Sequence, residues 1–96
     1  MSQANYIIIC KGRIDFDSAK DVPAKVRALS DAATNLTSHI DITHPGELTE
    51  TDVKPISDLQ HELMNHWRTM SKDQVEAHAI TMFGYLDALE DKFEPV

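Results

Sequence analysis

The stretch from Pro55 to Phe93 constrains the fold most, because its apolar residues recur with the period of two helices that match each other. The second part of this stretch has an apolar residue at alternating steps of four and three positions: Val75, Ala79, Met82, Leu86, Leu89 and Phe93. In the first part, a similar stripe contains Ile56, Leu59, Leu63 and Trp67. Such spacing places each set on one side of an α-helix. We therefore predict two amphipathic helices, over 51–70 and 72–93, paired as an antiparallel helical hairpin.

Ser71 marks the turn between these two helices. The segment Ser-Lys-Asp-Gln has the pattern of a capping box, in which the side chains of Ser71 and Gln74 each accept a hydrogen bond from the other residue's backbone N–H. A further helix is predicted over 21–37, because Asp21 can cap its first turn and Pro23 is tolerated within that turn. The apolar stripe of this helix contains Val22, Val26, Leu29, Ala33 and Leu36.

The N-terminal segment 5–16 is predicted to form a β-hairpin. Its first run, Tyr6–Cys10, is rich in β-branched residues, and Lys11-Gly12 separates that run from a second one, Arg13–Phe16. A two-residue loop would pair Ile9 with Ile14 and place both on one face. Because a lone hairpin is barely stable in water, we expect the apolar face to pack against the helices.

Residues 38–43 fit two structures. Ile40 continues the helical stripe of 21–37, whereas the run from Ser38 to Thr43 alternates polar and apolar residues as a strand does. We favour a short third strand that covers an edge of the hairpin, with a turn at His44-Pro45-Gly46 after it. The predicted fold is therefore α+β and dominated by helices, with residues 1–96 in a single domain.

The charge of the chain argues against direct binding to nucleic acid or to an anionic membrane. Sixteen acidic residues against nine basic ones give a net charge of −7, and both of those ligands require a positive surface. Cys10 is the only cysteine, so no internal disulfide can form. The apolar run Ile7–Cys10 is too short for a signal-peptide core, and no stretch approaches the length of a membrane span. These features predict a cytoplasmic protein.

The histidines do not predict a metal site. His61-Glu-Leu-Met-Asn-His66 is similar to the zinc-protease helix motif, but the two imidazoles are five residues apart instead of four. That spacing turns the second ring by ~140° around the helix axis, so the pair cannot chelate one ion. Cys10 lies in an apolar run, where a thiol normally stays protonated. We therefore predict a non-catalytic protein with no metal and no cofactor.

His66 and His78 both border the apolar stripe near the same turn of the helical hairpin. Glu62 precedes His66 by one helical turn and can pair with it. Two interpretations remain open for this pair of histidines. They are either boundary residues of the core or a pH-sensitive or metal-binding contact.

The back of the last predicted helix is the surface that folding explains least. Opposite its core stripe lie small residues around Gly84, although a glycine inside a helix costs about 1 kcal/mol relative to alanine. Either an external partner docks there, or the helix 21–37 fills the groove with Ala24, Ala28 and Ala32. For the first interpretation, the predicted partner-binding residues are Asp73, Glu76, Ile80, Gly84, Asp87, Asp91 and Glu94.

The expected function is an acidic protein–protein interaction module that blocks or tunes a basic or nucleic-acid-binding protein partner. In its general character, as a short, acidic and helical chain, it resembles the small inhibitors that phages and mobile elements direct against bacterial machinery, such as anti-CRISPR proteins and DNA mimics. That resemblance implies an anti-defence role without catalysis. The alternative is a structural or regulatory homo-oligomer, a homodimer for instance, assembled through the N-terminal strand. A metal-binding or enzymatic domain is the third possibility.

Overall fold

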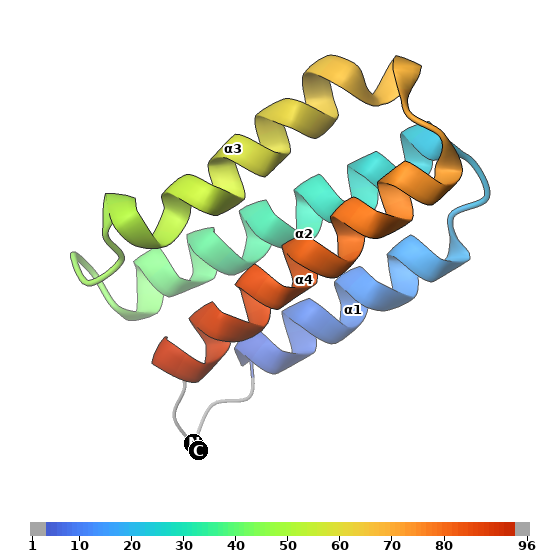
Figure 1. Ribbon diagram of the computed structural model, residues 1–96. Helices are drawn as coiled ribbons and strands as arrows, with labels where there is room; N and C mark the ends of the chain where they lie inside the picture. The colour runs from blue at the N-terminus through green and yellow to red at the C-terminus, as the bar shows by residue number, and fades with distance from the viewer. Residues whose placement is uncertain (1–3, 94–96) are drawn as a thin grey trace.

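The computed structural model describes residues 4–93, which form four α-helices and one short 3₁₀ helix. The helices are α1 (Ala4–Ser18), α2 (Val22–Thr43), α3 (Glu50–His66) and α4 (Lys72–Phe93), with the 3₁₀ turn η1 (Trp67–Thr69) after α3. Each helix runs antiparallel to the one before it, so the chain is an up-down-up-down bundle (Figure 1).

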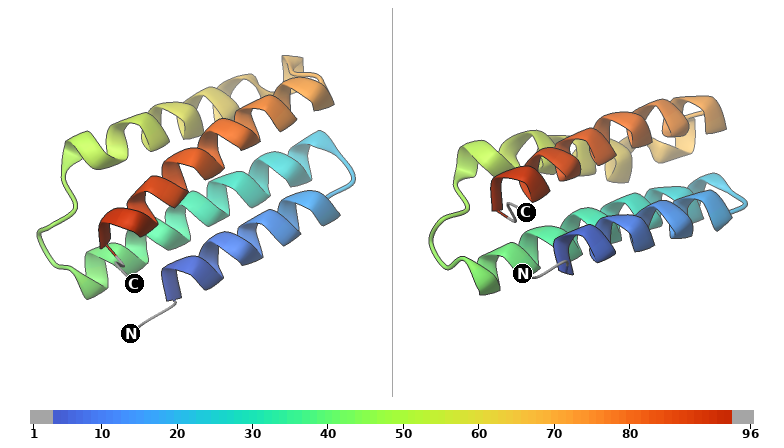
Figure 2. Two further views of the ribbon diagram at one scale, coloured as in Figure 1. Left: turned by 60° about the horizontal axis from the view of Figure 1, so that its bottom comes forward. Right: turned by 90° about the horizontal axis from the view of Figure 1, so that it is seen from below.

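The helices form two layers, with α1 beside α2 in one layer and α3 beside α4 in the other (Figure 2). Both α1 and α3 pack against α2 and α4, and α2 also packs directly against α4. The core lies where the four apolar stripes meet. Its large, fully buried side chains are Leu29, Leu36, Ile40, Ile56, Leu63, Val75, Met82 and Leu86.

The prediction of an N-terminal β-hairpin, and with it the α+β class, was wrong. Residues 4–18 form α1, and no strand occurs within residues 4–93. The buried residues of α1 are Asn5, Ile9, Gly12 and Phe16, which follow one another at steps of four, three and four. That is the helical period, and it turns Ile14 out to 64% exposure, whereas a hairpin would have placed it beside Ile9.

Gly12 was interpreted as a turn residue, but it lies inside α1 at a close contact with α2. A β-carbon built on Gly12 would lie 2.6 Å from the β-carbon of Ala32. Only glycine therefore permits this approach of the two helices. The isoleucine-rich segment has a local preference for a strand, but its packing against α2 and α4 outweighs that preference. Local propensities are small beside the free energy of tertiary burial.

The predicted third strand near 38–43 is also absent. Residues 38–43 form the last turns of α2, where Ile40 is fully buried and Ile42 is 76% exposed. The helix ends where the backbone N–H of His44 donates to the Ile40 carbonyl at 2.8 Å, and Gly46 takes a positive φ of 77° in the turn that follows. Because both the predicted hairpin and the predicted third strand are helical in the described part of the chain, neither offers a strand edge for assembly.

The N-terminal ends of α3 and α4 are fixed by hydrogen-bonded caps. The predicted capping box at Ser71 is present: the Ser71 N–H donates to Gln74 Oε1 at 2.7 Å, and the Gln74 N–H donates to Ser71 Oγ at 3.2 Å. A second capping box joins Thr49 and Asp52 at the start of α3. At its other end α3 stops at His66, earlier than residue 70, and Trp67 begins the 3₁₀ turn.

Candidate functional site

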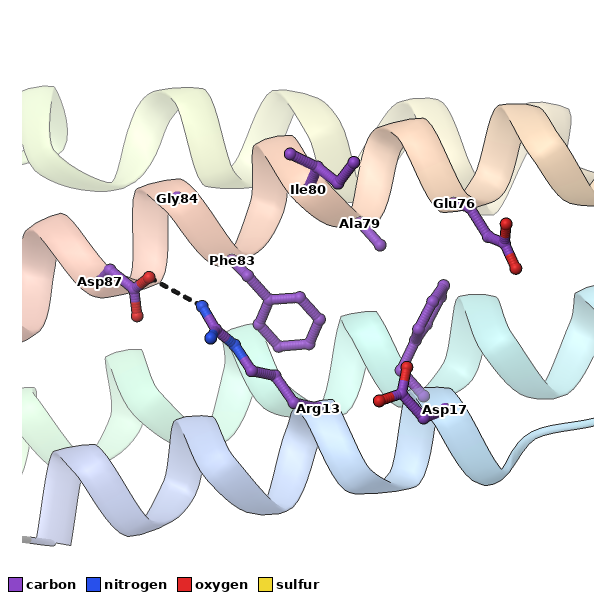
Figure 3. A pocket seen from close by; sticks show the side chains of 9 residues that line it. Arg13, Asp17, Glu76, Ala79, Ile80, Phe83, Gly84 and Asp87 are labelled. Atoms are coloured by element: carbon purple, nitrogen blue, oxygen red, sulfur yellow. Dashed lines mark hydrogen bonds and ion pairs between the residues drawn. The ribbon is translucent and has the colours of Figure 1, made fainter.

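An open groove runs between α1 and α4 and has a volume of about 580 Å³. Its lining residues from α1 are Arg13, Phe16 and Asp17. Those from α4 are Glu76, Ala79, Ile80, Phe83, Gly84 and Asp87. In Figure 3, Arg13 and Phe83 lie between the two helices with α2 behind them, and Ile80 lies on the side of α4 away from α1. We call this feature the α1/α4 groove.

The floor of the α1/α4 groove is aromatic. Phe16 and Phe83 meet edge to face, with ring centroids 6.3 Å apart, and both are at least nine-tenths buried. Beneath them, the buried Lys25 of α2 donates from Nζ to the Phe16 carbonyl at 2.8 Å and lies 4.3 Å from the centre of the Phe16 ring. The floor is therefore held in place from inside the bundle before any ligand is bound.

The α4 wall of the groove combines an exposed apolar side chain with an open glycine. Ile80 is 78% exposed, the highest value among the exposed large hydrophobic residues of 4–93. No atom lies within 4 Å of a β-carbon built on Gly84, so the α4 backbone is accessible at that position. Ala28 and Ala32 of α2 are buried, and Ala32 faces Gly12 of α1, so these alanines do not fill the space at Gly84.

One end of the groove is spanned by an ion pair and the other end carries acids alone. Arg13 Nη2 donates to Asp87 Oδ2 at 2.7 Å, and the Arg13 guanidinium lies 5.1 Å from the centre of the Phe83 ring. At the other end, Asp17 of α1 and Glu76 of α4 are exposed across the groove (Figure 3). Neither forms an ion pair within residues 4–93. The groove therefore has a surplus of negative charge.

Four of the residues predicted to bind a partner line the α1/α4 groove, namely Glu76, Ile80, Gly84 and Asp87. Asp73 and Asp91 are exposed on α4 but are not among its lining residues. Glu94 lies outside the described residues. The structure therefore joins the middle of the predicted surface to a second helix that the prediction did not include.

The groove residues of α1 were missed because the hairpin prediction separated them from α4. Arg13 and Asp17 lie one helical turn apart, and Phe16 belongs to the buried stripe of α1. The helical spacing of Asn5, Ile9, Gly12 and Phe16 was present in the sequence, beside the period-two spacing that favoured a strand.

His66 and His78 do come together, at a polar depression between α3 and α4. It has a volume of about 290 Å³ and is lined by Glu62, His66, Thr69, Met70, Gln74 and His78. Within residues 4–93 no group of three or more His, Cys, Asp or Glu side chains is arranged to hold a metal ion. Both histidines thus line the same depression, as their positions in the sequence predict.

Comparison with family models, curated proteins and solved structures finds no match to this chain. The prediction that the protein is mostly helical is confirmed. Its description as an inhibitor of phage or anti-defence type gains no relative in support, and a dimer built on strands is ruled out by the helical N-terminus. In the part of the chain that the structure describes, no helix has the length and apolarity that crossing a bilayer requires.

Proposed function

We propose that this protein is a non-catalytic protein–protein interaction module, with the α1/α4 groove as its docking surface for a basic partner. The observation that carries the proposal is the groove itself, in which an aromatic floor and the exposed Ile80 are bordered by unpaired acids. Interfaces of moderate size have this composition, with aromatic anchors at the centre and a polar rim.

Charge complementarity indicates the chemistry of the partner. Asp17 and Glu76 border the open end of the groove, and the whole chain carries a net charge of −7. Acids at a rim attract a basic surface and raise the rate of association. Proteins that bind nucleic acid have such basic surfaces, so docking there would compete with their nucleic acid. We place this interaction in the cytoplasm, on the ground of the single Cys10 and the absence of any cysteine pair in the sequence.

A defined basic probe tests the proposal. The probe is a synthetic amphipathic peptide of roughly 18 residues, long enough to form a helix when docked, with leucines on one side and arginines on the other. Fluorescence anisotropy at low salt gives its Kd. The double variant Asp17→Lys/Glu76→Lys should weaken binding by about tenfold, because two attractive rim charges become repulsive.

The control has the same change in net charge on other helices. Asp41 of α2 and Glu62 of α3 are exposed and do not line the α1/α4 groove. If Asp41→Lys/Glu62→Lys weakens binding as much as the groove variant does, the peptide is responding to net charge alone, and the groove is not the docking surface.

A homo-oligomer is the second candidate, favoured by the outer face of α1. Tyr6, Ile7 and Ile14 are exposed there by 56%, 61% and 64%. Ile7 and Ile14 lie two helical turns apart on the same side of α1, and another copy can cover a contiguous apolar patch of that kind. Sedimentation velocity of the parent and of Ile14→Glu distinguishes this candidate, because a dimer through this face would dissociate in the variant, whereas a monomeric parent would exclude it.

A further inference from the structure

Arg13 occupies one end of the α1/α4 groove by means of two different contacts. Its guanidinium donates to the Asp87 carboxylate at 2.7 Å and also lies 5.1 Å from the centre of the Phe83 ring. Both receptor groups belong to α4, on adjacent turns, while Arg13 comes from α1 (Figure 3). A carboxylate beside an aromatic ring is a combination that recognises guanidinium, because the planar cation pairs with the first and stacks on the second.

This contact is weak enough to be replaced. The side chains of Arg13 and Asp87 are 48% and 51% exposed, so water competes for the ion pair and the low-dielectric gain of a buried pair is missing. Phe83, in contrast, is buried and fixed against Phe16. The ring of the subsite is therefore fixed, and the ion pair beside it is open to water, so another guanidinium can take the place of Arg13.

We propose that Asp87 and Phe83 form an arginine-binding subsite that Arg13 fills in the free protein and that an arginine of the partner fills in the complex. This inference rests on the proposed function, because it specifies what the basic partner inserts at one end of the groove. Arg13 then acts as an intramolecular competitor. It lowers the apparent affinity in proportion to the fraction of molecules in which it covers the subsite.

The spacing along α4 restricts the partner further. Glu76 and Asp87 are eleven residues apart on one helix, which corresponds to about 16 Å at 1.5 Å per residue. A helix lying in the groove would meet both acids with an arginine at one position and a second basic residue about eleven positions away. Gly84 lies between them and lets the partner's backbone come close to α4. The partner that fits is therefore a basic amphipathic helix with arginine at one end of its contact surface.

The same contact has a simpler interpretation, in which Arg13 only clamps α1 to α4. The two accounts predict opposite effects of removing Arg13. A clamp would leave the groove less ordered in its absence and weaken binding, whereas a competitor would leave the subsite free and strengthen binding.

Titrations with two peptides decide between these accounts. One is the arginine peptide described above, and the other has lysine at every arginine position. The variant Arg13→Ala should lower the Kd of the arginine peptide by about fivefold, the factor expected from losing an exposed ion pair and a cation–π contact that compete with it. For the lysine peptide the gain should be about twofold, because an ammonium ion lacks the planar fork.

Lys11→Ala is the matched control. Lys11 lies on the same helix, its removal changes the net charge by the same amount, and it pairs with Asp15 instead of reaching the α1/α4 groove. Its Kd for the arginine peptide should stay within about twofold of the parent value. Arg13→Gln is measured as well, since it keeps the aliphatic part of the side chain and guards against a packing defect in the alanine variant.

The outcomes separate this inference from the function on which it rests. If neither the parent nor Arg13→Ala nor Arg13→Gln binds either peptide, the proposed function fails and the subsite fails with it. If the parent binds through Asp17 and Glu76 but both Arg13 variants bind equally or more weakly, the docking groove stands and the competitor role is overturned. Stronger binding in Lys11→Ala to the same degree would also overturn it, because the gain would then come from net charge.

Discussion

The substitution of alanine for glycine has opposite predicted effects at two positions of this bundle. In an exposed helix interior the change is stabilising, because alanine has the better helix propensity by about 0.8–1.0 kcal/mol. Gly84 meets that condition, since nothing lies within 4 Å of the added β-carbon. Gly84→Ala should therefore raise the free energy of unfolding by about 1 kcal/mol. For a domain of this size that corresponds to a rise in Tm of about 4–8 °C.

Gly12 provides the contrasting case. The added β-carbon would lie 2.6 Å from Ala32 Cβ and 3.4 Å from Phe83 Cε1. Because the β-carbon of Ala32 is attached directly to the backbone of α2, no side-chain rotation relieves the contact and the two helices must separate. Overpacking of this kind costs typically 1–3 kcal/mol. After the gain in helix propensity, Gly12→Ala should be destabilised by about 1 kcal/mol, with a Tm lower than that of the parent.

Urea and thermal unfolding followed by circular dichroism measure both variants. The double variant Gly12→Ala/Ala32→Gly restores the space. Its free energy of unfolding should therefore be higher, by about 1 kcal/mol or more, than the value obtained by adding the two single-variant changes to the parent value. A Gly12→Ala variant more stable than the parent would refute the close packing of α1 on α2. A destabilised Gly84→Ala variant would show that Gly84 is covered, and the α1/α4 groove would lose its open wall.

Three further predictions concern contacts between elements. The ammonium of Lys92 and the backbone N–H of Thr49 lower the pKa of the Asp52 carboxyl below its ordinary value near 3.8. The contribution of the Asp52 carboxylate to folding stability is therefore complete above that value, and it is lost as the pH falls through the lower pKa of the folded state. The Tm of Asp52→Asn should thus be below the parent Tm at pH 7 and approach it in strong acid. Trp67→Ala should cost about 1.5–3 kcal/mol in urea unfolding, less than a fully buried tryptophan, because Trp67 is only partly buried. Lys25→Met should cost about 1 kcal/mol by the same assay, since the Phe16 carbonyl loses the ammonium donor and keeps the Ala19 N–H at 3.2 Å, and an unchanged stability would show that the hydrogen bond from Lys25 contributes nothing net.

The sequence by itself determined the helical hairpin at the C-terminal end. The stripe from Val75 to Phe93 fits only a helix, and Ser71 with Gln74 specifies where that helix begins. These features depend on residues within one or two turns of each other, so local spacing and local hydrogen bonds are sufficient to predict them. The acidic outer side of α4 is a local property of the same kind.

Only the tertiary structure decided the state of the N-terminal segment. Ile7 and Ile9, with Ile14 and Phe16, satisfy a period of two, while Ile9 and Phe16 also belong to a helical stripe. Local spacing therefore fits both a strand and a helix. The deciding contacts are those between Gly12 and Ala32 and between Phe16 and Phe83, which join residues 20 and 67 positions apart in the chain. Such contacts form only when the helices pack.

The α1/α4 groove follows from the same packing. Its acids on α4 were identified from the sequence, but its floor and its Arg13–Asp87 pair require two helices from opposite ends of the chain to lie side by side. A helix propensity differs by less than 1 kcal/mol between most residues, whereas burial of a single large apolar side chain contributes about 1.5–3 kcal/mol. Burial in the bundle therefore sets both the conformation of α1 and the position of the groove.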